Sequence, residues 1–379
     1  MPTILLALNL LLASIIPSYK LVFFYKILPS NNQALNINFE LSRNELCSPI
    51  IKNNILYQGM YNNLILAQDI KNKKVLWQYH TIGEPTNTIL YKDILIITTV
   101  KGYIYALNSK NGGLIWSYNT QKEILSMPVV KNGNVYIQTT LDTLYAFAAA
   151  DGSLIWQYSS KNILEGLMVH LNPSPYIKNN VLYTGFSNGS AVALDAVTGK
   201  LIWIKKPQTI KQLQDIIITP GGNDQIVIFG SYDNGLFCLN KKDGNMVWER
   251  RDLTRPIGLY VTDSAVYAAT ASGRVYRLDA RTGDTIWGTD LGHESNPTNI
   301  VSFFNSIVIG TQGDKYKGIV ILDRDTGNVI KHFEVVSGVS APPVIVDNNI
   351  YAVSNGGFLY CIEQNPVMSP HKAKCISLF

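Results

Sequence analysis

The chain has 379 residues, of which 46% are hydrophobic and 16% charged, and its formal net charge is +5 at pH 7. This composition leaves ample apolar surface for a core, and the 21 tyrosines and six tryptophans favour a β-rich fold. The lysines are scattered or lie in short runs such as residues 71–74, as solvated turns do, and no nucleic-acid-binding motif is visible.

The first thirty residues are predicted to be a signal or membrane-anchor-like segment. Residues 4–16 are almost entirely apolar, with the length of the apolar region of an export signal and too short to span a bilayer alone. A second apolar patch covers residues 21–28. A misplaced start codon is the alternative. No cysteine follows the apolar run, which puts a lipid anchor in doubt.

Residues 35–41 alternate apolar and polar side chains without a break. This period of two predicts a half-buried β-strand. The strand precedes all the repeats described next, and it is therefore free to pair with the far end of the chain.

A pattern that ends in tryptophan recurs through the rest of the sequence. Its clearest copy runs from Ala193 to Trp203: an apolar run, Asp195, a turn with Gly199, and a second apolar run. All six tryptophans occupy the same place in the pattern, at intervals of 39 to 47 residues: Trp77, Trp116, Trp156, Trp203, Trp248 and Trp287. The chain is therefore a repeat protein.

Each repeat has room for four short strands. In the third repeat the strands are predicted at residues 127–130, 135–139, 144–147 and 154–158. Four antiparallel strands in about 40 residues form the blade of a β-propeller. Eight such repeats predict an all-β, eight-bladed propeller over residues 31–365, followed by a tail at 366–379.

The tryptophans are expected to be structural. A blade cannot bury both faces alone, so a large apolar side chain on the fourth strand should pack between neighbouring blades, with its N–H free to bond a carbonyl. The seventh repeat has Lys331 at the tryptophan position, and the eighth stops after residue 362 without a fourth strand. We expect the strand at 35–41 to fill that place and close the ring.

Two connections between repeats are longer than the others. The extra residues lie within 159–172 and 207–218, which join the fourth strand of one blade to the first strand of the next. Because these blades are adjacent, the two connections should project side by side from one face. Insertions of this kind usually mark the binding face of a repeat protein.

The sequence contains no constellation that predicts catalysis, a metal site or a cofactor. The five histidines are dispersed and none has metal-ligand spacing. The turn aspartates are expected to cap their own backbone rather than to act as paired acids. The four cysteines are read as unpaired, because Cys238 and Cys361 fall three repeats apart.

The motif formed by Ala193, Asp195, Thr198, Gly199 and Trp203 resembles the tryptophan-docking motif of the pyrroloquinoline-quinone-like propellers, and it covers most of residues 45–365. Two groups share it. The quinoprotein alcohol dehydrogenases are longer and carry a vicinal cysteine pair and a calcium site, whereas this sequence has no adjacent cysteines. The length, eight repeats and exported start resemble the BamB family, the propeller subunit of the outer-membrane β-barrel assembly machinery.

The BamB resemblance implies a non-catalytic scaffold at the periplasmic face of the outer membrane of a Gram-negative bacterium. BamB proteins contact the barrel protein BamA through two stretches, which match Leu167, Val169 and His170 in the first long connection and Asp215 in the second. The match is partial, because His170 replaces an arginine and Ile217 replaces a second acid. Unfolded outer-membrane proteins are a further implied partner, held at exposed propeller edges.

Two other interpretations remain open. The propeller would bind a different protein partner, or it would be a quinone-dependent dehydrogenase. Co-purification with an outer-membrane barrel protein favours the scaffold, and a quinone absorbance band on reconstitution with Ca²⁺ favours the enzyme.

Overall fold

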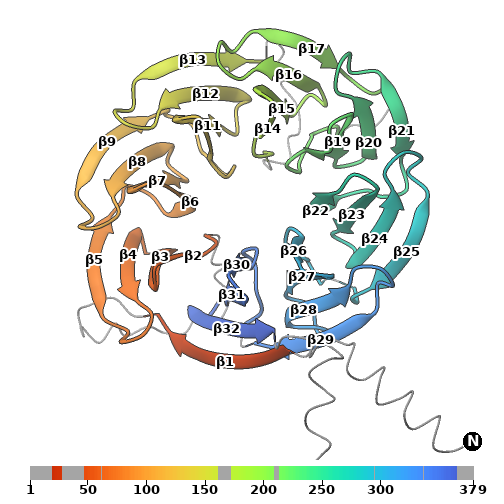
Figure 1. Ribbon diagram of the computed structural model, residues 1–379. Coiled ribbons are helices and arrows are strands. Elements are labelled where there is room, and N and C mark those ends of the chain that lie inside the picture. The colour runs from red at the N-terminus through yellow and green to blue at the C-terminus, as the bar shows by residue number, and fades with distance from the viewer. Residues whose placement is uncertain are drawn as a thin grey trace, which may run out of the picture.

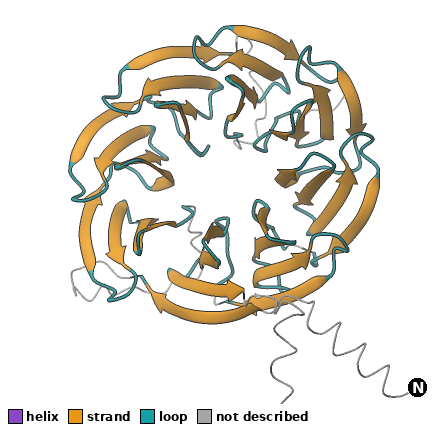
Figure 2. Cartoon of the chain, viewed as in Figure 1, coloured by secondary structure: helices purple, strands orange, loops and turns teal. Residues whose placement is uncertain are grey.

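The computed structural model is an eight-bladed β-propeller with one four-stranded antiparallel sheet per blade, which confirms the predicted fold (Figure 1). The structure describes residues 19–27, 47–60, 62–160, 172–208, 213–293, 295–335 and 337–364. Strands and loops make up this part of the chain (Figure 2). Among these residues we find no helix of the length and apolarity needed to cross a bilayer.

Each blade is a sheet of four strands, which follow one another from the centre of the ring to its rim. The innermost strands are β2 (Ile50–Lys52), β6 (Pro85–Tyr91), β10 (Val129–Lys131), β14 (Tyr176–Lys178), β18 (Gly221–Gly222), β22 (Pro256–Val261), β26 (Val301–Phe303) and β30 (Val344–Val346). The second strands are β3 (Ile55–Met60), β7 (Ile94–Thr99), β11 (Asn134–Gln138), β15 (Val181–Gly185), β19 (Ile226–Ser231), β23 (Ala265–Thr270), β27 (Ser306–Thr311) and β31 (Asn349–Val353).

The two outer layers complete the blades. The third strands are β4 (Leu64–Asp69), β8 (Tyr103–Asn108), β12 (Thr143–Ala148), β16 (Ala191–Asp195), β20 (Gly235–Asn240), β24 (Arg274–Asp279), β28 (Gly318–Asp323) and β32 (Phe358–Gln364). The outermost strands are β5 (Val75–His80), β9 (Leu114–Asn119), β13 (Leu154–Ser159), β17 (Leu201–Lys205), β21 (Met246–Arg250), β25 (Thr285–Asp290), β29 (Val329–Glu334) and β1 (Tyr19–Lys26).

The core consists of eight apolar layers, each lying between two neighbouring blades. Between blades three and four, for example, Leu144 and Trp156 pack with Leu182 and Leu194. The second and third strands of the blades are almost entirely buried, because they face a neighbour on both sides. Burial of this area is the main stabilising term of the fold.

Each tryptophan joins its blade to the next one. Trp156 donates its indole N–H to the carbonyl of Ala196 in blade four, at 3.1 Å. Gly199 lies against the same ring: its φ is +71°, and a Cβ at this position would lie 2.6 Å from the Trp156 ring. A glycine is therefore needed there for both space and backbone conformation. The other five indoles bond the next blade in the same way.

The ring closes through a different strand from the one predicted. β1, at Tyr19–Lys26, pairs antiparallel with β32, with Tyr19 opposite Gln364 and Lys26 opposite Phe358. Tyr19 also donates its hydroxyl to Ser306 Oγ of blade seven, at 2.8 Å. The prediction that residues 35–41 close the ring is therefore wrong, and those residues lie outside the described part of the chain.

The correction has a physical reason. Tyr19 and Tyr25 are buried in β1, while Val22 and Phe24 on its other side are 48% and 56% exposed. Because both sides carry apolar residues, the period of two is hidden within an apolar run that looks like a membrane anchor. The propeller therefore includes residues 19–26, so its boundary with the preceding segment lies before Tyr19 rather than at residue 30.

Candidate functional site

The described ends of the two long connections lie on one face of the ring. The connections join β13 to β14 and β17 to β18, and these ends are on the side where the turns between second and third strands also lie. Leu167, Val169 and His170 fall within 161–171, outside the described residues. Asp215 is described, as are the ends of both connections. These ends define the geometry of this face.

The segment 213–218 fastens the second connection to two blades. Ile216 forms an isolated antiparallel bridge with Ser231 of blade five. The backbone N–H of Ile216 donates to the carbonyl of Phe186 in blade four at 3.2 Å, and that of Ile217 donates to Gly230 at 2.9 Å. The segment is thus bonded to both blades and spans the seam between blades four and five.

A glycine in blade four leaves the space that the side chain of Ile216 occupies. Its side chain is 1% exposed, and a Cβ on Gly185 would lie 2.4 Å from the Cβ of Ile216. No other residue type would leave room for the isoleucine at this distance. No local sequence pattern indicates this pair, because Gly185 belongs to β15 and lies about 30 residues before Ile216 in the chain.

Asp215 lies at the predicted face but is not presented on its surface. The side chain is 3% exposed. Its backbone carbonyl accepts a hydrogen bond from the N–H of Tyr232 at 2.9 Å. In this conformation the residue holds the segment in place from within, rather than offering a carboxylate to a partner.

The carboxylate of Asp142 is also buried, and the charge of Asp215 affects its pKa. Asp142 is 1% exposed and accepts hydrogen bonds from the backbone N–H and the hydroxyl of Ser187, the former at 3.1 Å. Burial raises the pKa of Asp142 above its usual range; the hydrogen bonds from Ser187 oppose this effect, and the charge of Asp215 adds to it. Asp142 thus clips blade three to blade four.

The clip lies at the base of the first long connection. Ser160, the last described residue before that connection, donates its backbone N–H to the carbonyl of Asp142 at 3.2 Å. Asn188 donates its side-chain amide to Ser160 Oγ at 3.1 Å. One buried polar network therefore positions the start of the first connection, and Ile216 positions the end of the second.

Asp142 was not singled out from the sequence, although a signal was present. Its backbone has φ of +52°, and its N–H bonds the carbonyl three residues earlier. Glycine fills the same turn position in four other blades: Gly102, Gly189, Gly273 and Gly357. When an aspartate replaces a recurring glycine in a repeat protein, its side chain is expected to make an interaction that offsets the cost of the positive φ.

No group of three or more potential metal-ligating side chains occurs among the residues that the structure describes. Cys47, Cys238 and Cys361 are all buried, and no disulfide joins any two of these three described cysteines. Burial raises the pKa of the Cys238 thiol to about 12, and it therefore stays protonated at neutral pH.

Comparison with known proteins identifies a family whose model matches this sequence. A family model described as outer membrane protein assembly factor BamB matches residues 89–289 and 206–367. The BamB of Yersinia pestis is 25% identical over 323 residues, which cover 79% of this chain and 80% of the relative.

Two solved structures share the fold. The crystal structure of BamB from Moraxella catarrhalis has a TM-score of 0.75 at 18% identity and covers 91% of this chain and 100% of its own. Quinohemoprotein alcohol dehydrogenase from Comamonas testosteroni has a TM-score of 0.67 at 14% identity and covers 91% and 76%. At these identities the two likenesses describe architecture and carry no activity with them.

The buried carboxylate of Asp142 predicts a specific pH dependence of the stability of the fold. A raised pKa means that ionising Asp142 opposes folding, so its contribution is most favourable below the unfolded-state pKa of about 4 and is lost as pH rises through the folded-state pKa. Asp142→Asn keeps an acceptor for Ser187 and removes the ionisation. We expect the stability of the wild type relative to this variant to fall as the pH rises from 3 to 7.

Thermal unfolding at steps of pH measures this difference. Asp151→Asn is the matched control, because the hydrogen bonds from Ser153 lower the pKa of the exposed Asp151 carboxyl. For Asp151 the wild type should gain relative to its variant as pH rises. Parallel pH profiles for wild type and Asp142→Asn would contradict the assignment.

Proposed function

The chain belongs to the BamB family, and from this membership we propose that it acts as a non-catalytic scaffold in outer-membrane protein assembly. The observation that carries the proposal is the family match over residues 89–367, which includes both long connections. The dehydrogenase resemblance is confined to the fold at 14% identity. The site of action is the periplasmic face of the outer membrane.

The partner is a BamA-like barrel protein, bound through its periplasmic domains. Leu167 and Val169 would be its apolar anchors, with His170 orienting the contact. Buried aliphatic side chains supply most of the affinity in such interfaces, while charges mainly steer them. Support comes from the ends of the two connections, which the Asp142 clip and Ile216 hold at one face. Asp215 would act by keeping its segment folded.

Replacing both anchors tests this face. Leu167→Ala combined with Val169→Ala should weaken binding to the periplasmic domains of the BamA-like protein by about 1 to 4 kcal/mol. Val197→Ala is the matched control, because Val197 is 54% exposed in a turn on the opposite face. Calorimetry with the two purified proteins measures the affinities. Equal affinity for wild type and the double variant would exclude this face.

We propose unfolded outer-membrane proteins as a second partner, which binds at the rim of the ring. β5, β9 and β13, on three consecutive blades, contain no Asp, Glu, Lys or Arg, whereas every other outermost strand contains at least one. Charges on edge strands normally prevent pairing with other chains. Leu114, Ile115, Leu154 and Ile155 on these edges are 43–51% exposed.

An extended strand with alternating apolar residues fits such an edge. Each outermost strand is bonded within its sheet on one side only, so its other side can accept a further strand. The strands of outer-membrane barrels alternate apolar and polar residues in this way. The three uncharged edges would therefore hold a barrel strand before it is inserted.

A single lysine on one edge tests the rim. Ile155→Lys on β13 should weaken binding of an unfolded outer-membrane barrel polypeptide about fivefold, which corresponds to about 1 kcal/mol. Val247→Lys is the control, because Val247 is 43% exposed and holds the same position before tryptophan on the charged strand β21. Fluorescence anisotropy with a labelled polypeptide measures binding. Equal effects of the two variants, or none, would contradict the proposal.

A further inference from the structure

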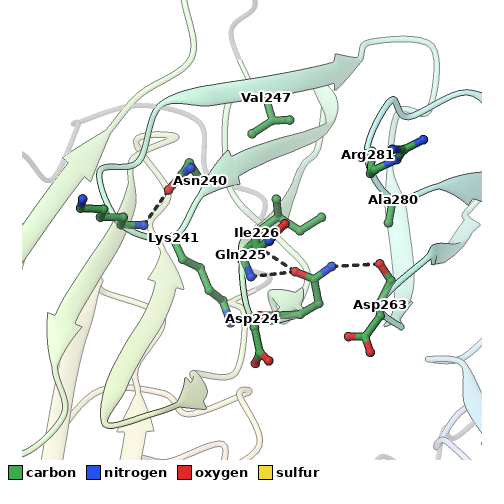
Figure 3. Close-up of a pocket in the computed structure, with 11 residues that line it drawn as sticks. Asp224, Gln225, Ile226, Asn240, Lys241, Val247, Asp263, Ala280 and Arg281 are labelled. Carbon is green, nitrogen blue, oxygen red and sulfur yellow. Dashed lines mark hydrogen bonds between the residues drawn. The ribbon is translucent and has the colours of Figure 1, made fainter.

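An open cleft lies on the face opposite the long connections. It has a volume of about 610 Å³ and is lined by the turns of blades five and six. Lys241 and Asp224 stand on its blade-five side, and Arg281 stands on the blade-six side (Figure 3). Nothing in the proposed scaffold role uses this cleft.

The backbone of Lys241 is fixed on both sides. Its N–H donates to the carbonyl of Gln225 at 2.9 Å, and its carbonyl accepts the indole N–H of Trp203 at 2.9 Å. The residue follows β20 directly and is therefore held at the seam between blades four and five. From there the side chain extends toward blade four, where its amine lies over two tyrosine rings.

The amine of Lys241 is enclosed by aromatic rings. Its Nζ lies 5.1 Å from the ring centre of Tyr176 and 5.2 Å from that of Tyr183, both in blade four, and it donates to the carbonyl of Asn223. The carboxylate of Asp224 is bound to Lys178 at 2.6 Å. Asp224 is thus already paired with Lys178, and the charge of Lys178 also opposes a positive charge on Lys241.

These surroundings favour the neutral amine. Burial lowers the pKa of Lys241 to about 8, and the charge of Lys178 acts in the same direction. The charge of Asp224 and the faces of the two tyrosines act in the opposite direction. With a pKa near 8, about a quarter of the amine is unprotonated at pH 7.5, against about one part in a thousand for an ordinary lysine. A neutral lysine amine is a nucleophile.

Charges of both signs line the cleft. Asp224 and Asp263 are its two acids, and Asp224 is already paired with Lys178. Lys242 and Arg281 also line it, and within the described part of the chain neither side chain is bonded to a carboxylate, so the positive charges are in excess and would attract a negatively charged reactant. Arginine and lysine are the usual partners of phosphate groups. A small molecule that carries a phosphate next to an electrophilic carbon therefore matches the cleft.

We propose that Lys241 is a modification site that accepts the acyl group of a small acyl phosphate. The neutral amine attacks the acyl carbon, so that an N–C bond forms. The C–O bond to phosphate breaks with its electron pair leaving on inorganic phosphate, and the proton lost from nitrogen passes to water. The product is an amide on Lys241, which abolishes the positive charge beside Lys178.

Acetyl phosphate and site-resolved mass spectrometry test the proposal on the full chain. At pH 7.5 Lys241 should be acetylated at least tenfold faster than Lys242, its neighbour on the same cleft. The rate at Lys241 should level off above about pH 9, where the amine is fully neutral. An equal rate at the two lysines would overturn the proposal, as would a rate at Lys241 that keeps rising through pH 10.

Two variants separate the amine from the cleft. Lys178→Gln removes the repelling charge and frees Asp224, so it should slow acetylation of Lys241 at pH 7.5 at least threefold and move its inflection to higher pH. Arg281→Gln should slow the reaction with acetyl phosphate at least threefold and leave that with the uncharged reagent N-acetoxysuccinimide unchanged. Equal rates of wild type and Arg281→Gln toward acetyl phosphate would overturn the choice of an anionic donor.

Discussion

The structure depends on one repeated contact: an indole ring from one blade that packs on the next. At each of six seams the ring covers a turn of the neighbouring blade, and its N–H satisfies a carbonyl that the seam would otherwise bury without a partner. The contact sets both the distance and the rotation between two sheets. Because it recurs at intervals of one blade, it fixes the arrangement of successive blades around the ring.

The places where the repeat is broken are the places where specific properties arise. Asp142 replaces a recurring turn glycine, and its carboxylate positions the base of a long connection. The charges that protect the rim are missing from β5, β9 and β13. Lys241 directly follows β20, the third strand of blade five, and its side chain enters the seam between blades four and five over two tyrosines. The repeated residues build the frame, and these departures give its faces different chemistry.

The sequence was sufficient for the fold but not for the site. Local patterns of about 40 residues predicted the blades, and in blade three the observed strands begin and end within two residues of the predicted ones. Ring closure was misassigned, since β1 exposes apolar side chains on the side where a regular strand would be polar. The pairs Asp142 with Ser187 and Ile216 with Gly185 join different blades, so no local pattern contains both partners.

The central claim is that the tryptophan seams hold the ring together, and the unfolding free energy of Trp156→Ala tests it most directly. Trp156 is 9% exposed, whereas Leu154 on the same strand is 44% exposed and contributes nothing to the seam between blades three and four. Denaturant unfolding should show a loss of about 3 to 5 kcal/mol for Trp156→Ala and a change within about 0.5 kcal/mol for Leu154→Ala. Losses of equal size for the two variants would contradict the account.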